Sequence, residues 1–400
     1  MNPNLDRLHP YPFEKLTRLK AGISIPENLS SISLGIGEPK HPAPAFVKQV
    51  IADHLDKLAN YPTTRGMDEL RQAISQWATR RFQLKPGSLS PQAHVVPVNG
   101  TREGIFSLVQ AAIASRPEAT VVSPNPFYQV YEGAALLAGA TPVYLPCDAG
   151  NGFIPDFDAV PDSVWKNCQI LFLCSPGNPS GAVIPRDTLS KVIALADKHD
   201  FIVASDECYS ELYPDEQQPP EGLLQTCAAM GRDDYRRCVV FHSLSKRSNL
   251  PGLRSGFVAG DANILKGYLQ YRTYHGCAMP IHNQLASIAA WQDENHVREN
   301  RAAYREKFRT VVPMLQEVMD LDYPDAGFYL WARTPMDDET FARDLSASQN
   351  VHVLPGRYLS RTVDGHNPGE NRVRMALVAP LDECVEAARR IVEFVKASKA

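Results

Sequence analysis

The stretch CVVFHSLSKRSNLPGLRSGFVAGD, residues 238–261, decides how the rest of the chain is interpreted. It begins with an apolar run typical of a buried strand, and a polar break then leads into a loop that Pro251 and Gly252 close before a second apolar strand. Lys246 lies just past the first strand, at the point where a chain leaves a sheet. We therefore expect its side chain to face a cleft.

The polar residues around Lys246 suit one kind of ligand. Ser243 and Ser245 precede the lysine, and Arg254 follows it. Hydroxyl groups and a guanidinium hold a phosphate, while a lysine amine forms a Schiff base with an aldehyde. The loop is thus suited to a phosphorylated aldehyde. Taken alone, the same residues are equally compatible with ordinary surface polarity.

Length and composition limit the classes of protein. The 400 residues exceed the usual size of one hydrophobic core and predict two subdomains. A formal net charge of −4 without a basic tract argues against nucleic acid or an anionic membrane as partner. No signal-peptide core and no run of about 20 apolar residues is present, which predicts a cytoplasmic protein without a membrane span. The 8 cysteines lack ligand spacing, so we expect free thiols and no metal.

Short apolar runs alternate with helical periodicities from His94 onward. This alternation predicts an α/β fold with a mainly parallel, doubly wound sheet that helices cover on both faces. Ligands of such sheets lie beyond the carboxyl ends of the strands. The expected strands are 95–98, 119–123, 141–145, 169–174, 201–205, 238–242 and 255–259, and the helices between them include 101–115, 127–137, 186–199 and 262–271.

The chain is expected to divide into an N-terminal segment, a large ligand-binding domain and a smaller α/β domain. The proline-rich residues 1–45 form the segment, which should pack with the small domain and which exposes bare backbone at Gly35 and Gly37. The large domain covers 46–280, and the small C-terminal domain covers 281–400. Further expected helices are 44–58, 67–82, 281–292, 296–319 near the hinge, and 381–397.

Two strand ends carry residues that can bind a ligand, one through backbone N–H groups and the other through an amide side chain. Gly100, Thr101 and Arg102 end a strand and open a helix, where backbone N–H groups and the helix dipole bind phosphate. Asn178 lies in the turn CSPGNPSG, whose prolines and glycines should hold the amide side chain rigidly. A group that binds both cofactor and substrate requires such rigidity. Each motif alone is also compatible with a simple turn.

Other polar residues interrupt apolar strands. Asp206 ends a buried strand and should face a cation, which could be a protonated pyridine nitrogen, an arginine or a metal. The metal is the disfavoured partner, because no cluster of histidines or carboxylates lies near Asp206. Tyr209 can reach the phenolic oxygen of such a ring, and Tyr128 can stack on it or simply pack in the core. Arg374 lies in an apolar strand, where a substrate carboxylate is a natural bidentate partner.

In this order and spacing, the motifs NPSG, SDECY, SLSK and GLRSG resemble the class I/II aminotransferases of pyridoxal-phosphate fold type I over nearly the whole chain. The resemblance implies a transaminase that acts on amino acids and 2-oxo acids as a homodimer, with pyridoxal 5′-phosphate as cofactor. Lys246, Asp206 and Tyr209 would be catalytic, with Lys246 bound to the cofactor and moving protons between Cα and C4′.

The resemblance also implies the residues that surround the cofactor and the substrate. Arg102 departs from the commoner lysine or small residue at its position, which leaves its role open. The implied cofactor-binding residues are Gly100, Thr101, Arg102, Tyr128, Asn178, Asp206, Tyr209, Ser243, Ser245, Lys246 and Arg254, with the partner subunit's Tyr61. Those implied for the substrate α-carboxylate are Gly37, Asn178 and Arg374.

Within this family the chain looks most like the succinyldiaminopimelate aminotransferases of lysine biosynthesis, notably in NPNLDRLHPYPFEKL, TYHGCAMP and VLPGRYLSR. A long acceptor with remote carboxylates needs cations beyond Arg374, and the candidates are Arg18, Arg102, Arg272, His275 and Arg357. The alternatives are an aminotransferase for N-acetylornithine, aspartate, alanine or kynurenine, a β-lyase, decarboxylase or synthase with the same cofactor, and a non-catalytic aminotransferase-like binding domain. The intact Lys246 disfavours the last.

Overall fold

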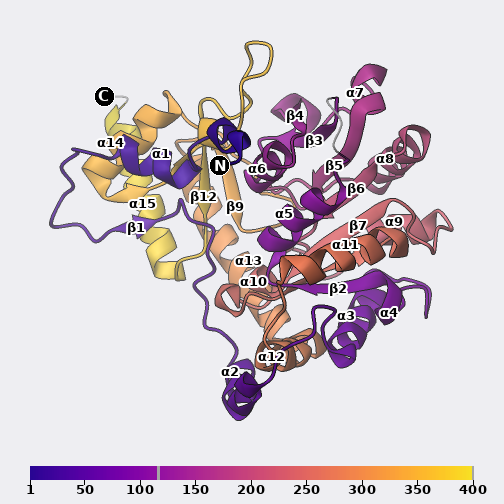
Figure 1. Cartoon of the computed structure of the whole chain (residues 1–400). Helices are drawn as coiled ribbons and strands as arrows, with labels where there is room; N and C mark the ends of the chain where they lie inside the picture. The colour runs from indigo at the N-terminus through magenta and orange to yellow at the C-terminus, as the bar shows by residue number, and fades with distance from the viewer. Residues whose placement is uncertain (115–117, 399–400) are drawn as a thin grey trace.

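The computed structural model of the protein describes residues 1–114 and 118–398, and its largest layer is a seven-stranded sheet (Figure 1). The strand order is β2-β8-β7-β6-β5-β3-β4. Strand β8 is antiparallel to both β2 and β7, and the other neighbouring pairs are parallel. The strands are β2 (Val95–Val98), β3 (Thr120–Asn125), β4 (Thr141–Pro146), β5 (Cys168–Cys174), β6 (Ile202–Asp206), β7 (Cys238–Ser243) and β8 (Gly256–Gly260).

Helices cover both faces of this sheet because its central strands are apolar on both sides. In β5, Ile170 and Phe172 belong to one buried cluster, whereas Leu171 and Leu173 belong to the cluster on the opposite face. This alternation is the consequence of the two-residue repeat of a strand. The first cluster includes side chains of α5 (Thr101–Ala112), α6 (Val130–Leu137) and α11 (Ala262–His275); the second includes those of α3 (Asp68–Arg81), α8 (Arg186–His199), α9 (Leu223–Ala229) and α12 (Ile281–Gln292).

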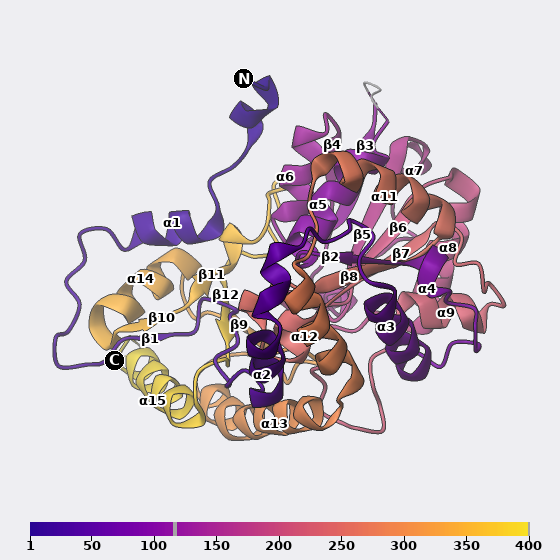
Figure 2. The same cartoon turned by 60° about the horizontal axis from the view of Figure 1, so that its bottom comes forward.

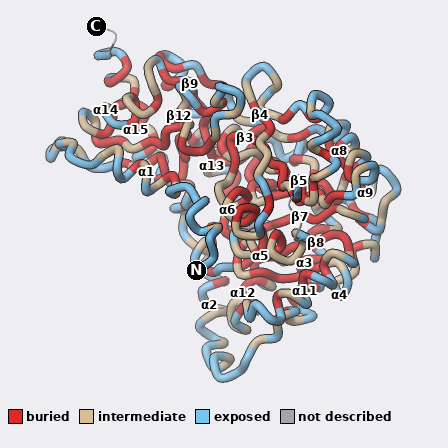
Figure 3. The backbone as a smooth tube through the Cα atoms, turned by 45° about the horizontal axis from the view of Figure 1, so that its top comes forward, coloured by how far each residue is buried: buried red, intermediate tan, exposed pale blue. Residues whose placement is uncertain are grey.

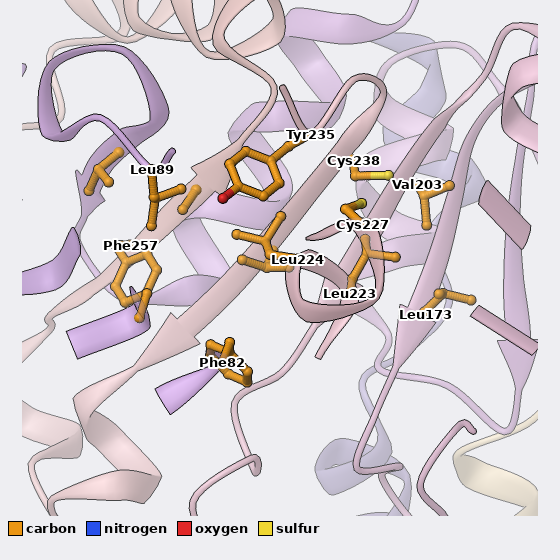
Figure 4. Close-up of a cluster of buried hydrophobic side chains, with 14 of the residues drawn as sticks. Phe82, Leu89, Leu173, Val203, Leu223, Leu224, Cys227, Tyr235, Cys238 and Phe257 are labelled. Carbon is orange, nitrogen blue, oxygen red and sulfur yellow. The ribbon is translucent and has the colours of Figure 1, made fainter. Parts of the chain in front are cut away.

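Helix α9 shows how one face is filled. Leu223, Leu224 and Cys227 of this helix are buried together with Phe82 and Val203 (Figure 4). Burying a leucine side chain completely contributes about 1.5–3 kcal/mol, so clusters of this kind hold the strand ends in fixed positions. Figure 3 shows buried residues along the strands and exposed ones mainly on loops and outer helix surfaces.

A smaller α/β part follows the large sheet in the chain. Its antiparallel sheet has the order β11-β12-β9, formed by β9 (Tyr329–Arg333), β11 (Leu354–Pro355) and β12 (Arg372–Ala376). Side chains of α13 (Asn295–Gln316), α14 (Asp338–Gln349) and α15 (Leu381–Ser398) share one buried cluster with it. Figure 2 shows α13 lying between α15 and α12, and therefore alongside both parts of the chain.

The N-terminal segment pairs with the C-terminal part. Strand β1 (Ile32–Ser33) runs parallel to β10 (Val351–His352), and α1 (Pro12–Leu19) lies beside β11 (Figure 2). This pairing agrees with the expected packing of the segment, while the domain bounds 1–45, 46–280 and 281–400 stay a prediction. The remaining elements are the α-helices α2 (Ala45–Asp53), α4 (Pro91–His94), α7 (Asp162–Asn167) and α10 (Leu244–Arg247), and the 3-10 helices η1 (Pro3–Arg7), η2 (Leu55–Ala59), η3 (Ala149–Asn151), η4 (Pro251–Leu253) and η5 (Gly356–Tyr358).

The expected α/β fold with a mainly parallel sheet is confirmed, and several element ends differ for local reasons. The helix expected over 127–137 begins at Val130, because the Phe127 amide instead donates to the Leu359 carbonyl. The helix expected over 44–58 breaks at His54, which is not helical. The helix expected over 101–115 ends at Ala112, and residue 115 lies outside the described residues. None of the described helices is long and apolar enough to cross a membrane.

Candidate active site

One edge of the large sheet gathers the predicted site residues. The parallel strands β5 and β6 and the strand β7 deliver the chain to this edge at their carboxyl ends. Because β8 is antiparallel to β7, the residues that precede β8 reach the same edge. Lys246 follows β7 and Arg254 precedes β8. Both residues therefore lie at this same edge of the sheet.

Lys246 lies in the short helix α10, directly after β7. Its Nζ donates a 2.5 Å hydrogen bond to the Gly37 carbonyl and lies 5.3 Å from the centre of the Phe328 ring. Burial lowers the pKa of the Lys246 ammonium to about 8, and the Arg374 guanidinium also lowers it. A lysine in this state supplies a neutral amine near neutral pH, which is the form that attacks a carbonyl.

Asp206 ends β6 as a buried carboxylate. Its Oδ2 accepts a 2.9 Å hydrogen bond from the Tyr131 hydroxyl, and its Oδ1 accepts one of 3.3 Å from the Cys208 amide. Burial raises the pKa of the Asp206 carboxyl despite these bonds. Among residues 1–114 and 118–398 no cation forms an ion pair with Asp206, so the cationic partner expected from the sequence is not a side chain of this part of the chain.

Arg374 links the small sheet to the turn that follows β5 of the large sheet. From β12 its guanidinium donates 2.9 Å to Asn178 Oδ1 and 2.8 Å to the Gly35 carbonyl. The guanidinium carbon lies 4.4 Å from the centre of the Tyr329 ring, whose hydroxyl is 3.0 Å from the Tyr209 hydroxyl. Arg374 forms no ion pair within the described residues and is 4% exposed. A buried guanidinium without a carboxylate is suited to an anionic ligand.

A cradle of backbone amides and hydroxyls forms where β2 meets α5. Gly100 caps this helix with a φ of 82°, and a Cβ at Gly100 would collide with the Arg254 guanidinium. The Arg254 side chain itself donates 2.8 Å to the Pro251 carbonyl. Thr101 opens the helix, and its Oγ1 lies 3.1 Å from Cys208 Sγ, which places the cradle beside the end of β6. Free amides at a helix start bind phosphate.

The serines before Lys246 form a turn of their own. Ser243 caps α10, and its Oγ accepts a 3.0 Å hydrogen bond from the Ser245 amide. Both serines are buried, at the edge from which Lys246 emerges. Ser243 thus ends β7, and Ser245 and Lys246 share the short helix α10, so the polar break expected from the sequence is a helical turn.

Arg102 extends to two tyrosines. Its Nε donates 2.6 Å to the Tyr128 hydroxyl, and another guanidinium nitrogen donates 3.3 Å to the Tyr11 hydroxyl. Burial raises the pKa of Tyr128, so its hydroxyl keeps its proton while it accepts from the arginine. Within the described residues Arg102 has no carboxylate partner. It belongs to the site but leaves donors free for an anion.

The other candidates for remote carboxylates are already occupied. Arg18 pairs with Glu14, and the buried Arg272 pairs with Glu103. Arg357 bonds the carboxylates that open α14, among them Asp338 at 2.8 Å. His275 Nδ1 lies 4.0 Å from Glu103, the carboxylate that also pairs with Arg272. These partners leave Arg102 as the candidate cation that no carboxylate of the described chain neutralises.

Tyr61 does not join this group within one chain. It lies in the turn between η2 and α3 and is 100% exposed. The nearby Leu55 and Leu58 are exposed as well, at 50% and 68%. A fully exposed tyrosine beside exposed leucines is typical of a surface that another protein covers.

Three aromatic residues of the site were not predicted from the sequence. Tyr131 bonds Asp206, Phe328 approaches Lys246, and Tyr329 fills the space beside Gly37, where a Cβ would collide with its hydroxyl. Tyr131 is the second residue of α6, Phe328 directly precedes β9, and Tyr329 is the first residue of that strand. Their only signal was aromatic character, which core packing explains equally well.

The fold is that of a fold-type I aminotransferase, and comparison with known proteins identifies the family. Residues 30–391 match the family model described as aminotransferase class I and II. The chain therefore belongs to the class I and II aminotransferases, whose members use pyridoxal 5′-phosphate.

Individual relatives cover almost the whole chain. An LL-diaminopimelate aminotransferase of Nitratidesulfovibrio vulgaris is 32% identical over 98% of this chain and 98% of its own. The crystal structure of an aminotransferase from Neisseria meningitidis is 49% identical with a TM-score of 0.94, and covers 99% of this chain and 100% of that one. A probable N-succinyldiaminopimelate aminotransferase of Thermus thermophilus is 27% identical, with a TM-score of 0.83 and coverages of 96% and 99%.

Proposed function

We propose that this aminotransferase uses pyridoxal 5′-phosphate held at the described sheet edge, and that it transfers the amino group of a diaminopimelate-type substrate to 2-oxoglutarate. The observation that carries the proposal is the position of Lys246. Its amine has a pKa of about 8 and emerges at the sheet edge that also carries the phosphate cradle and the buried Asp206, which forms no ion pair within the described residues.

The residues present fit this cofactor. Glycine at position 100 leaves space that a Cβ would fill against Arg254, so an anion can approach the amides of α5. Asp206 is a buried carboxylate without an ion-pair partner in the described part of the chain, and a protonated ring nitrogen would supply a cation. When bound, the cofactor acts as an electron sink that stabilises negative charge at the substrate Cα. We assign the phosphate to Gly100, Thr101, Arg102, Ser243, Ser245 and Arg254, and the ring to Tyr128, Asn178, Asp206 and Tyr209.

Each side chain would then have a defined task. Lys246 Nζ takes the proton from the substrate Cα, because a neutral amine near its pKa is an effective base. Asp206 keeps the ring nitrogen protonated, and the Tyr131 hydroxyl holds this carboxylate in place. Arg374 binds the substrate α-carboxylate, oriented by Asn178 and assisted by the Gly37 backbone.

The charges near Lys246 support a substrate with a second carboxylate and a second amine. Arg374 and Arg102 both act on the pKa of Lys246, and neither has a carboxylate partner among the described residues. Glu38 also acts on that pKa; it is exposed and forms no ion pair in the same part of the chain. Arg374 would complement one carboxylate of free diaminopimelate, and Glu38 its distal ammonium. Arg102, which we also assign to the cofactor phosphate, donates to two tyrosines and has donors left for the second carboxylate.

The names of relatives support the same class of substrate. Relatives at about 32% identity are LL-diaminopimelate aminotransferases, whereas the Thermus thermophilus structure carries the succinylated name. The sequence motifs favoured the succinylated compound. A succinylated amine is a neutral amide and gives Glu38 no cation to bind, so we favour the free diamine.

The test compares kcat/KM for LL-diaminopimelate and N-succinyl-LL-diaminopimelate, with 2-oxoglutarate as acceptor and aspartate, alanine and kynurenine as further donors. We expect the free diamine to be the best donor, and Glu38→Gln to lower its kcat/KM without lowering that of the succinylated compound. A higher kcat/KM for the succinylated compound would restore the sequence-based assignment. Preference for aspartate, alanine or kynurenine would remove the diaminopimelate assignment and leave the aminotransferase.

The proposal includes a homodimer. Tyr61 is exposed in one chain, and in this family its counterpart would complete the phosphate site of the neighbouring subunit. Exposed leucines beside it support a contact surface there.

A further inference from the structure

A groove of about 670 Å³ lies along α13, outside the site described above. One wall is α13 itself, and the other is formed by the chain after Glu211 and by the loop before β9. Its apolar lining includes Leu212, Tyr213, Pro214, Phe308, Tyr323 and Pro324. We call this feature the α13 groove.

Three arginines line the α13 groove at intervals of four residues along the helix. Residues spaced in this way lie on one face of a helix. Arg301 and Arg305 share the Glu216 carboxylate, with hydrogen bonds of 2.7 Å and 2.8 Å. Arg309 continues the row, is exposed, and forms neither an ion pair nor a side-chain hydrogen bond within residues 1–114 and 118–398. The row thus ends with a cation that lacks its anion.

We propose that the α13 groove binds a small amphipathic carboxylate, with its apolar body on the Tyr213, Phe308 and Tyr323 side chains and its carboxylate on Arg309. The volume lies within the range of about 300–1,000 Å³ that is usual for small-molecule sites. Apolar walls with a few placed charges are also usual in such sites, and the charged side chains that line this groove are Arg301, Arg305, Glu306 and Arg309. The inference does not depend on the substrate proposed above.

The α13 groove is linked to the active site by short contacts. At its floor the Gly327 amide donates 2.6 Å to the Leu212 carbonyl, which joins the loop before β9 to the chain that follows β6. Phe328 comes next, and its ring lies 5.3 Å from Lys246 Nζ. Tyr304, which lines the groove, stacks on Phe328 with ring centres 5.6 Å apart. An occupant therefore touches side chains one layer away from the lysine.

The test measures binding of 2-naphthoate to the holoenzyme by isothermal titration calorimetry, with the uncharged 2-naphthalenemethanol as comparison. We expect the carboxylate to bind more tightly than the alcohol, and Arg309→Gln to weaken its binding about fivefold or more. Arg298→Gln is the control, because Arg298 is an exposed arginine of α13 that does not line the groove.

A second measurement separates the α13 groove from the active site. Saturating 2-oxoglutarate should leave naphthoate binding unchanged, and Arg309→Gln should leave kcat/KM without naphthoate unchanged. Competition with 2-oxoglutarate would place the ligand at Arg374 and overturn the proposal. Equal affinities of the Arg309→Gln and Arg298→Gln variants would overturn it as well. Neither outcome concerns the choice of amino donor, so this inference and the proposed function fail separately.

Discussion

Lys246 and Gly37 are 209 residues apart in the chain and are joined by a 2.5 Å hydrogen bond from Nζ to the carbonyl oxygen. Gly35, two residues earlier, accepts a hydrogen bond from Arg374. The N-terminal segment is therefore held across the site by the two cations assigned to cofactor and substrate. Its backbone is part of the site although it precedes the large sheet in the chain.

The lowered pKa of Lys246 predicts the pH dependence of cofactor attachment. A lysine with a pKa of about 8 is roughly one-tenth neutral at pH 7 and half neutral at pH 8, so the reactive fraction rises with pH through that value. We expect the rate at which the cofactor-free protein binds pyridoxal phosphate covalently to rise with a midpoint near pH 8. Stopped-flow absorbance measures the rate, and borohydride reduction followed by peptide mapping locates the label. Lys246→Ala should lose it; a midpoint above pH 10 or a label on another lysine would contradict the assignment.

Alanine at position 37 should disturb the site. A Cβ there would lie 2.8 Å from Tyr329 Cζ and would overlap its hydroxyl, so the segment has to move away from Lys246 and Arg374. We expect Gly37→Ala to raise KM for the amino donor about tenfold or more. Gly267→Ala is the control, because it lies in α11 with no atom within 4 Å of the new Cβ. Unchanged KM values in both variants would show that the Gly37 backbone has no part in binding.

A matched pair of glycines tests the phosphate cradle. Gly100 and Gly87 both have a φ of 82°, so alanine at either position costs about 1–2 kcal/mol of backbone strain. At Gly100 the new Cβ also meets Arg254, whereas at Gly87 no atom lies within 4 Å. We expect the backbone strain to lower the free energy of unfolding in urea by a similar amount in both variants. Only Gly100→Ala should also weaken cofactor binding, by about tenfold. Equal cofactor Kd values would contradict the cradle.

Hybrid dimers test the role of Tyr61. If the partner subunit's Tyr61 completes each phosphate site, a dimer of one Tyr61→Phe chain and one Lys246→Ala chain has one site that carries neither change. We expect about a quarter of wild-type activity in an equal mixture after subunit exchange, because half of the dimers are hybrids. Mass spectrometry of differently tagged chains confirms the exchange. No recovery in exchanged dimers would show that each site belongs to a single chain.

A largely buried polar chain runs from Lys307 of α13 to the helix turn that carries Lys246. Lys307 Nζ lies 2.7 Å from His41 Nε2, His41 Nδ1 lies 2.7 Å from Asn300 Oδ1, and Asn300 Nδ2 donates 3.3 Å to the Lys246 carbonyl. Because the ammonium donates to Nε2, the proton of the neutral ring is on Nδ1. His41→Ala leaves one N–H of the buried Lys307 ammonium without its acceptor, while the Leu377 and Val378 carbonyls keep the others, and should cost about 1–3 kcal/mol in urea unfolding.

The control for this change is His9→Ala. His9 has a side chain that is 52% exposed, so its loss should change the free energy of unfolding by less than about 0.5 kcal/mol. Equal effects of the two substitutions would show that the buried chain contributes nothing.

The sequence by itself determined the α/β alternation and the strand ends at which Lys246, Asp206 and Asn178 stand. These features follow from local hydrophobic periodicity and turn residues, which act over short distances along the chain. The order of β2, β8 and β7 did not follow, because strand pairing joins segments far apart in sequence. The antiparallel β8 nevertheless explains why Arg254, before its strand, reaches the edge that the other residues reach after theirs.

Only the tertiary structure decided which charges are free. Arg18, Arg272 and Arg102 look alike in the sequence, but the first two have carboxylate partners and Arg102 has tyrosines. The same holds for Asp206, whose partner proved to be Tyr131. Whether a charge is neutralised depends on atoms within a few ångströms, and these come from distant segments whose approach only the packed fold determines.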